Sequence, residues 1–299
     1  MQRPRNDLDS TPLPPAKVLH GYGHFRFGAD GITRDVYHAG DVRDPPVLVV
    51  CELAGFSPGL LLFCDRLRHS GFQVHVPWLF GPFGRRAPVR NALRLCISRE
   101  FSHLRAGTTA PIANWLRTLA GHISRQQGNR QVGAIGMCLT GAFVIPLVID
   151  SHVGAAIAAQ PAIPCSLLFA VLGIRSPRSM RALNVDAQDI ALARERLSTG
   201  AARLLAVRAR ADRICPAEKI ERLREEFPIG MDVREYGELS TRNCLGGRPH
   251  ALLTKEHRLE PDAPPGHWAH DAFADITLFL KRYLQGSSEL QPAARASPM

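Results

Sequence analysis

The chain has 299 residues, of which 45% are apolar and 21% are charged. That apolar share is typical of globular proteins and excludes a disordered or collagen-like chain. The 37 basic and 27 acidic side chains give a formal net charge of +10, and 33 of the basic ones are arginines spread along the sequence. Because nucleic-acid binding needs basic residues clustered on one face, we expect no nucleic-acid partner.

Short apolar runs alternate with segments of helical periodicity, which predicts an α/β protein. In chain order, we predict strands at 32–37, 46–51, 73–76, 132–135, 154–159, 204–209 and 232–236, and helices at 60–69, 89–101, 112–125, 139–149, 189–197, 217–226 and 268–284. This alternation implies a mostly parallel central sheet with helices on both faces. Ligands of such sheets bind at the carboxyl ends of the strands.

The ends of the chain and its cysteines predict where the protein resides. Residues 1–16 and 286–299 are polar and rich in proline, so we expect disordered tails on either side of a single domain at 17–285. Seven sparse cysteines and no apolar leader indicate a cytoplasmic protein with free thiols. The uncharged run 132–149 is divided by glycines and Pro146, which favours buried elements over a membrane span.

The first candidate for chemistry is Cys138, in Gly-Met-Cys138-Leu-Thr-Gly between the strand 132–135 and the helix 139–149. A nucleophile on a sharp strand-to-helix turn is lifted clear of the sheet. The helix N-terminus would favour the thiolate, and the N–H of Leu139 would be placed to donate to an oxyanion. The alternative is a small buried cysteine in a glycine-rich packing turn.

Two more residues follow Cys138 in the order nucleophile, acid, histidine, which is the order of the α/β-hydrolases. Asp212 comes directly after the strand 204–209, and its alternative role is that of a helix N-cap. The histidines after it are His250, His257, His267 and His270. We favour His250, because it lies in the loop after the strand 232–236, where the base is expected.

Glu52 is the fourth candidate, because it immediately follows the apolar strand 46–51. A carboxylate at the carboxyl end of a central strand faces the ligand side and is costly to bury unpaired. The alternative is an exposed loop glutamate.

These segments together resemble the dienelactone hydrolase family of α/β-hydrolases. The resemblance covers about residues 46–283 and is carried by Val-Leu-Val-Val-Cys-Glu52-Leu-Ala-Gly, Gly-Met-Cys138-Leu-Thr-Gly-Ala, Asp212-Arg-Ile-Cys-Pro and the late His250. It implies the α/β-hydrolase fold and a cofactor-free hydrolase, similar to carboxymethylenebutenolidase, that opens a small-molecule lactone or carboxylic ester through a thioester acyl-enzyme.

The resemblance also implies a role for each residue. Cys138 would be the nucleophile and His250 its base, oriented by Asp212. Glu52 would interact with the thiol and help to activate it as the substrate binds. The backbone N–H groups of Leu53 and Leu139 would form the oxyanion hole.

The chain departs from the family pattern at several positions. Thr140 stands where the family usually has glycine, and Thr254 stands four residues after His250, where family members hold a substrate carboxylate with an arginine. A second such arginine would come from the stretch 85–99, where Arg94 and Arg99 are our candidates and a solvated helix face is the alternative. The segment 160–200 has room for a cap over the site.

Two other functions remain open from the sequence. One is a general carboxylesterase or thioesterase, and the other is a non-catalytic ligand-binding protein with the α/β-hydrolase fold. No C-x-x-C, H-E-x-x-H or nucleotide-binding glycine motif is present, so we expect neither a metal nor a nucleotide cofactor.

Overall fold

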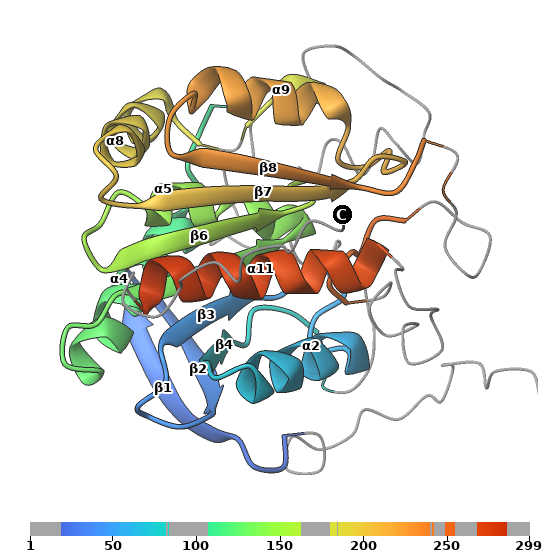
Figure 1. The fold of residues 1–299 in the computed structure, drawn as a ribbon. Coiled ribbons are helices and arrows are strands. Elements are labelled where there is room, and N and C mark those ends of the chain that lie inside the picture. The colour runs from blue at the N-terminus through green and yellow to red at the C-terminus, as the bar shows by residue number, and fades with distance from the viewer. Residues whose placement is uncertain are drawn as a thin grey trace, which may run out of the picture.

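The structure, a computed structural model, describes residues 19–81, 83, 107–162, 180–183, 185–239, 241, 249–254 and 268–285. Eight strands form one sheet in the order β1-β2-β4-β3-β5-β6-β7-β8 (Figure 1). The strands are β1 (Gly23–Ala29), β2 (Ile32–Ala39), β3 (Pro46–Val50), β4 (Gln73–Pro77), β5 (Val132–Met137), β6 (Val153–Ala159), β7 (Arg203–Ala209) and β8 (Met231–Tyr236). From β4 to β8 all neighbours in the sheet are parallel, whereas β1 pairs antiparallel with β2 and β2 pairs antiparallel with β4. The predicted mostly parallel sheet is confirmed.

Helices cover both faces of the sheet, as predicted. They are α2 (Pro58–His69), α4 (Pro111–Gln126), α5 (Val144–Leu147), α8 (Ala187–Ser198), α9 (Ala217–Glu226) and α11 (Trp268–Leu284). Figure 1 shows α2 and α11 in front of the sheet and α4 and α5 behind it. The rings of Phe63 in α2 and Phe273 in α11 meet edge to face at 6.1 Å, which joins the two front helices.

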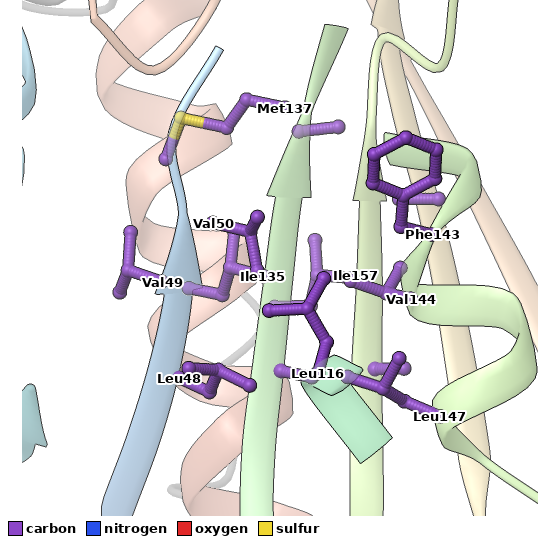
Figure 2. Close-up of a cluster of buried hydrophobic side chains, with 14 of the residues drawn as sticks. Leu48, Val49, Val50, Leu116, Ile135, Met137, Phe143, Val144, Leu147 and Ile157 are labelled. Carbon is purple, nitrogen blue, oxygen red and sulfur yellow. The ribbon is translucent and has the colours of Figure 1, made fainter. Parts of the chain in front are cut away.

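The core lies around the central strands. Every residue of β3, β5 and β6 is buried, which explains why their sequences are runs of valine, isoleucine, alanine and glycine without polar alternation. Leu116 of α4 and Val144 of α5 pack against the strands beside Ile135 and Ile157 (Figure 2). Central strands held on both faces give a rigid base for the residues that follow their ends.

The edge strand β1 is absent from the sequence prediction. It forms a hairpin with β2 through Asp30 and Gly31, whose φ angles of 52° and 74° suit a tight primed turn. Phe27 of β1 packs on Trp115 and His122 of α4, with ring centroids 5.6 and 5.0 Å apart. The Asp-Gly pair between two alternating segments is the signal that would have revealed this hairpin.

The predicted helix 139–149 is wrong in its form. The chain instead makes a 3-10 helix at Cys138–Ala142 and the short α5. Pro146 lacks the N–H that would bond to the carbonyl of Ala142, and its ring clashes with that carbonyl in a continuous α-helix. No continuous α-helix therefore starts at Cys138, and the expected effect of a helix N-terminus on its thiolate is not supported.

Some predictions concern residues outside the described part of the chain. These are the helix 89–101 and both tails, at 1–16 and 286–299. In the segments that are described, no helix combines the length and the apolarity needed to cross a membrane.

Leu116→Ala is expected to lower the free energy of unfolding by about 2–5 kcal/mol, because it leaves a cavity in the packed core. Leu116 is fully buried, whereas the control residue Leu278 in α11 is 55% exposed. Leu278→Ala should change the same quantity by less than about 0.5 kcal/mol. Chemical denaturation of both variants measures the difference, and equal losses would contradict this account of the core.

Candidate active site

Cys138 sits on a strained turn directly after β5. Its φ is +57°, in the left-handed region that non-glycine residues seldom adopt. A Cβ at Gly136 would collide with the carbonyl of Thr140, and one at Gly141 would lie 2.9 Å from Cα of Pro161. The glycines are therefore required by close backbone approach, and the turn has the shape of a nucleophile elbow. Backbone strain of this kind collects at functional sites.

Thr140 ties this turn to the end of β3. Its side chain is fully buried, and its hydroxyl oxygen accepts a hydrogen bond from the N–H of Met137 at 2.9 Å. The same hydroxyl lies 2.9 Å from the carbonyl oxygen of Val50, to which it donates. A buried hydroxyl needs such partners, so the threonine fits this tight position by satisfying backbone groups of both strands.

His250 and Asp212 are brought together from segments 38 residues apart. His250 Nδ1 and Asp212 Oδ2 form a hydrogen bond of 2.7 Å. The other carboxylate oxygen of Asp212 accepts from the N–H of Ile214 at 2.8 Å and of Cys215 at 3.1 Å. Asp212 is not a helix N-cap, because α9 begins after Pro216. Three hydrogen bonds thus hold a carboxylate that is only 4% exposed.

The electrostatics of His250 couple it to both Asp212 and Cys138. Burial disfavours the imidazolium, but the interactions with the Asp212 carboxylate and with Cys138 outweigh it and raise the pKa of His250 well above its ordinary value. Within the described chain, Nε2 of His250 is buried without a hydrogen-bond partner. This nitrogen is thus available for a proton that a reaction at Cys138 releases or consumes.

Glu52 is buried rather than exposed, so the reading of it as an exposed loop residue is wrong. It is 4% exposed and follows β3 at the level where Cys138 follows β5, because Val50 pairs with Gly136 in the parallel register. The hydroxyl of Thr254 donates to Glu52 Oε1 at 2.6 Å.

The turn at 250–254 carries two of these groups. The N–H of Leu252 bonds to the carbonyl of His250 at 2.9 Å, and the N–H of Thr254 bonds to that of Ala251 at 3.2 Å. One short turn therefore carries both His250, which bonds to Asp212, and Thr254, which bonds to Glu52.

The remaining predicted site residues fall into two groups. Leu53 and Leu139 directly follow Glu52 and Cys138, and both are buried. The described residues do not include Arg94, Arg99, His257 or His267, and they leave out 163–179 and 184 of the segment 160–200 that was expected to have room for a cap. Nor do they bring three or more His, Cys, Asp or Glu side chains together as a metal site would require.

The other described cysteines differ from Cys138 in their burial. Cys51, Cys64 and Cys215 are free thiols with no exposed surface. Burial, with Glu52 beside it, raises the pKa of Cys51 to about 12. Burial also raises the pKa of Cys64 and Cys215. These three thiols are therefore poor nucleophiles at neutral pH.

The contacts of Thr140 and Thr254 were not foreseen from the sequence, where both appeared only as departures from a pattern. The partners of their hydroxyls lie 90 and 202 residues away. Nothing in the local sequence marks such a contact, because it depends on the sheet order.

Asp212→Asn is expected to lower the pKa of His250 towards its ordinary value near 6.5, because the carboxylate that favours the imidazolium is lost. Because Asp212 raises the pKa of His250, the wild-type ring keeps its proton to a higher pH than the ring of the variant. An NMR titration of the His250 ring measures the change. Asp232→Asn, at an exposed position on β8, serves as the control, and an unchanged His250 titration in Asp212→Asn would contradict the assigned coupling.

Comparison with known proteins gives one family and a set of similar folds. The model of the dienelactone hydrolase family matches residues 35–234. A search of curated proteins finds no match.

Three solved structures illustrate the likeness in fold. Dienelactone hydrolase from Anabaena variabilis is 12% identical, with a TM-score of 0.56 over 89% of this chain and 100% of that one. A dienelactone hydrolase-like promiscuous phosphotriesterase from metagenomic libraries is 13% identical, with a TM-score of 0.58 over 88% and 98%. Est1E from Butyrivibrio proteoclasticus is 11% identical, with a TM-score of 0.53 over 88% and 100%. At these identities the likeness shows the α/β-hydrolase fold.

Proposed function

Because the chain belongs to the dienelactone hydrolase family, and is therefore a hydrolase that acts on ester bonds, we propose that it opens a small lactone or carboxylic ester by cysteine catalysis. The observation that carries the proposal is His250, which is hydrogen-bonded to Asp212 and electrostatically coupled to Cys138. A thiol needs a base and an orienting carboxylate to attack a carbonyl at neutral pH.

In the acylation step, the Cys138 sulfur attacks the carbonyl carbon of the ester or lactone. Glu52 interacts with the thiol as the substrate binds and helps to activate it, and the thiol proton passes to His250. The carbonyl oxygen becomes an oxyanion, to which the N–H groups of Leu53 and Leu139 are assigned as donors. When the C–O bond breaks, His250 gives its proton to the leaving alcohol oxygen, and a thioester remains on Cys138.

In the deacylation step, His250 takes a proton from water, and the resulting hydroxide adds to the thioester carbonyl. The C–S bond then breaks and the carboxylic acid leaves. The imidazolium of His250 returns its proton to the Cys138 thiolate, which restores the thiol and the neutral ring from which acylation begins. With a lactone, the alcohol and the acid stay in one molecule, so a single hydroxy acid is released.

The burial of the pair supports these roles. The N–H groups of Ile214 and Cys215 donate to Asp212 and hold its carboxylate beside His250, where it favours the imidazolium on which protonation of the leaving group depends. The left-handed turn at Cys138 lifts the sulfur away from the sheet, where a substrate can meet it. We assign residues 17–285 as the hydrolase domain, since the sheet and α11 lie within these bounds.

Iodoacetamide is expected to alkylate Cys138 before Cys51, Cys64 and Cys215, because burial raises the pKa of the other three. Cys138→Ala should lower kcat/KM for an activated neutral ester by about a thousandfold or more. Peptide mass spectrometry at increasing reagent dose locates the first site, and Cys64→Ala is the matched control that should retain activity. Equal reactivity of Cys138 with the buried thiols, together with full activity of Cys138→Ala, would remove the proposal.

Glu52→Gln is expected to slow the alkylation of Cys138 several-fold, because the amide keeps the shape of the side chain but is a weaker acceptor for the S–H hydrogen. The rate is followed from loss of the Cys138 peptide under excess reagent. Glu225→Gln, at an exposed site on α9, is the control that should leave the rate unchanged. If Glu52→Gln reacts at the wild-type rate, Glu52 has no part in activating the thiol.

A further inference from the structure

Glu52 presents a buried carboxylate that has a neutral partner. Its hydrogen-bond donor is the hydroxyl of Thr254, 2.6 Å from Oε1, and the two residues are 4% and 1% exposed. In the described part of the chain, no lysine, arginine or histidine forms a salt bridge with Glu52. A hydroxyl orients the carboxylate but brings no positive charge to it.

This carboxylate lies beside the place where an acyl group would be attached. β3 and β5 are parallel neighbours with Val50 opposite Gly136, so Glu52 and Cys138 each stand two residues beyond a paired position. Adjacent strands are separated by only about 4.8 Å. An acyl group on Cys138 would therefore be attached at the end of the strand that neighbours the one before Glu52.

Thr254 is held firmly in this position. A Cβ at Gly59 would lie 2.6 Å from the carbonyl oxygen of Thr254, so the start of α2 packs directly on the backbone of residue 254. Four residues earlier, the same turn is anchored by the bond between His250 and Asp212. The turn that places the hydroxyl of Thr254 against Glu52 is thus held in position at both of its ends.

We propose that Thr254 is a specificity-determining positioning residue, which holds the Glu52 carboxylate at the acyl site and so selects uncharged esters and lactones over those with a carboxylate in the acyl chain. The inference rests on the proposed function, because it places the acyl group on Cys138. Two like charges in a poorly hydrated site repel each other strongly, and a substrate is excluded as effectively by such repulsion as by a clash.

The test compares two activated esters that differ in charge. These are 4-nitrophenyl pentanoate and the mono-4-nitrophenyl ester of glutaric acid, with spontaneous hydrolysis subtracted for each. The wild-type enzyme is expected to favour the neutral ester by about tenfold or more in kcat/KM at neutral pH and low salt. A preference for the glutarate ester, or none, would overturn the inference and favour a cation such as Arg94 or Arg99 as the holder of a substrate carboxylate.

Variants then assign the preference to these residues. Glu52→Gln and Thr254→Arg should each reduce the neutral-to-anionic ratio by about threefold or more, even where absolute rates fall. Thr199→Arg is the matched control and should leave the ratio at the wild-type value. Thr199 is the exposed C-cap of α8 and precedes the amino end of β7, whereas the site follows the carboxyl ends of β3 and β5. An unchanged ratio in both Glu52→Gln and Thr254→Arg would refute the assignment.

A second pair of variants separates positioning from mere stability. Thr254→Val keeps the shape but removes the donor, so kcat for the neutral ester should fall while its KM stays near the wild-type value. Thr254→Ser restores the hydroxyl and should restore kcat, with circular dichroism reporting that each variant is folded. A loss in Thr254→Val that Thr254→Ser does not rescue would contradict a role for the hydroxyl.

The activity of Cys138→Ala on the neutral ester separates the hypothesis of cysteine catalysis from the hypothesis of charge selection by Thr254 and Glu52. If this variant keeps its activity, both hypotheses are wrong. If the variant is inactive but the wild type shows no preference between the esters, only the inference on Thr254 and Glu52 fails.

Discussion

The parallel pairing of β3 with β5 is the constraint on which the rest of the site depends. This register sets Val50 opposite Gly136, so the chain leaves the two strands at the same level with Glu52 on one side and Cys138 on the other. Thr140 then joins the two exits through its bonds to the backbone of Met137 and Val50. A shift of one residue in a parallel pair would reverse which face each side chain meets. Close packing of both faces of these strands makes that shift costly.

The second organising feature is the buried charge around His250. Removing an imidazolium and a carboxylate from water is unfavourable, and the structure compensates with hydrogen bonds from the backbone of Ile214 and Cys215 to Asp212. The same burial that penalises the charged ring also strengthens its interaction with Asp212 and Cys138, and the balance raises the pKa of His250. A buried ion pair of this kind contributes little to stability, which is consistent with its retention for chemistry.

Two threonines show how substitutions at fixed positions in a fold can change its electrostatics. Thr140 lies where the backbones of two strand ends come close together. Its hydroxyl accepts from the N–H of Met137 and donates to the carbonyl of Val50, and a glycine could make neither hydrogen bond. Thr254 gives Glu52 a donor without a positive charge. The first threonine joins the turn at Cys138 to the end of β3, and the second is the residue that we propose selects uncharged substrates.

The sequence by itself determined the order of elements and the identity of the candidate groups. Apolar runs such as 46–51 and turn residues such as Gly136 are local properties, so the parallel sheet and the position of Cys138 after a strand could be read directly. Asp212, His250 and Glu52 were candidates from their positions after predicted strands, and the family resemblance then assigned their roles. The sequence prediction omitted β1, although the Asp-Gly pair indicates a hairpin with β2. It also predicted one helix at 139–149, where Pro146 divides a segment that otherwise has helical composition. Only the tertiary structure decided that Glu52 is buried and that Thr254 is its partner, because that contact joins residues 202 positions apart through the order of strands in the sheet.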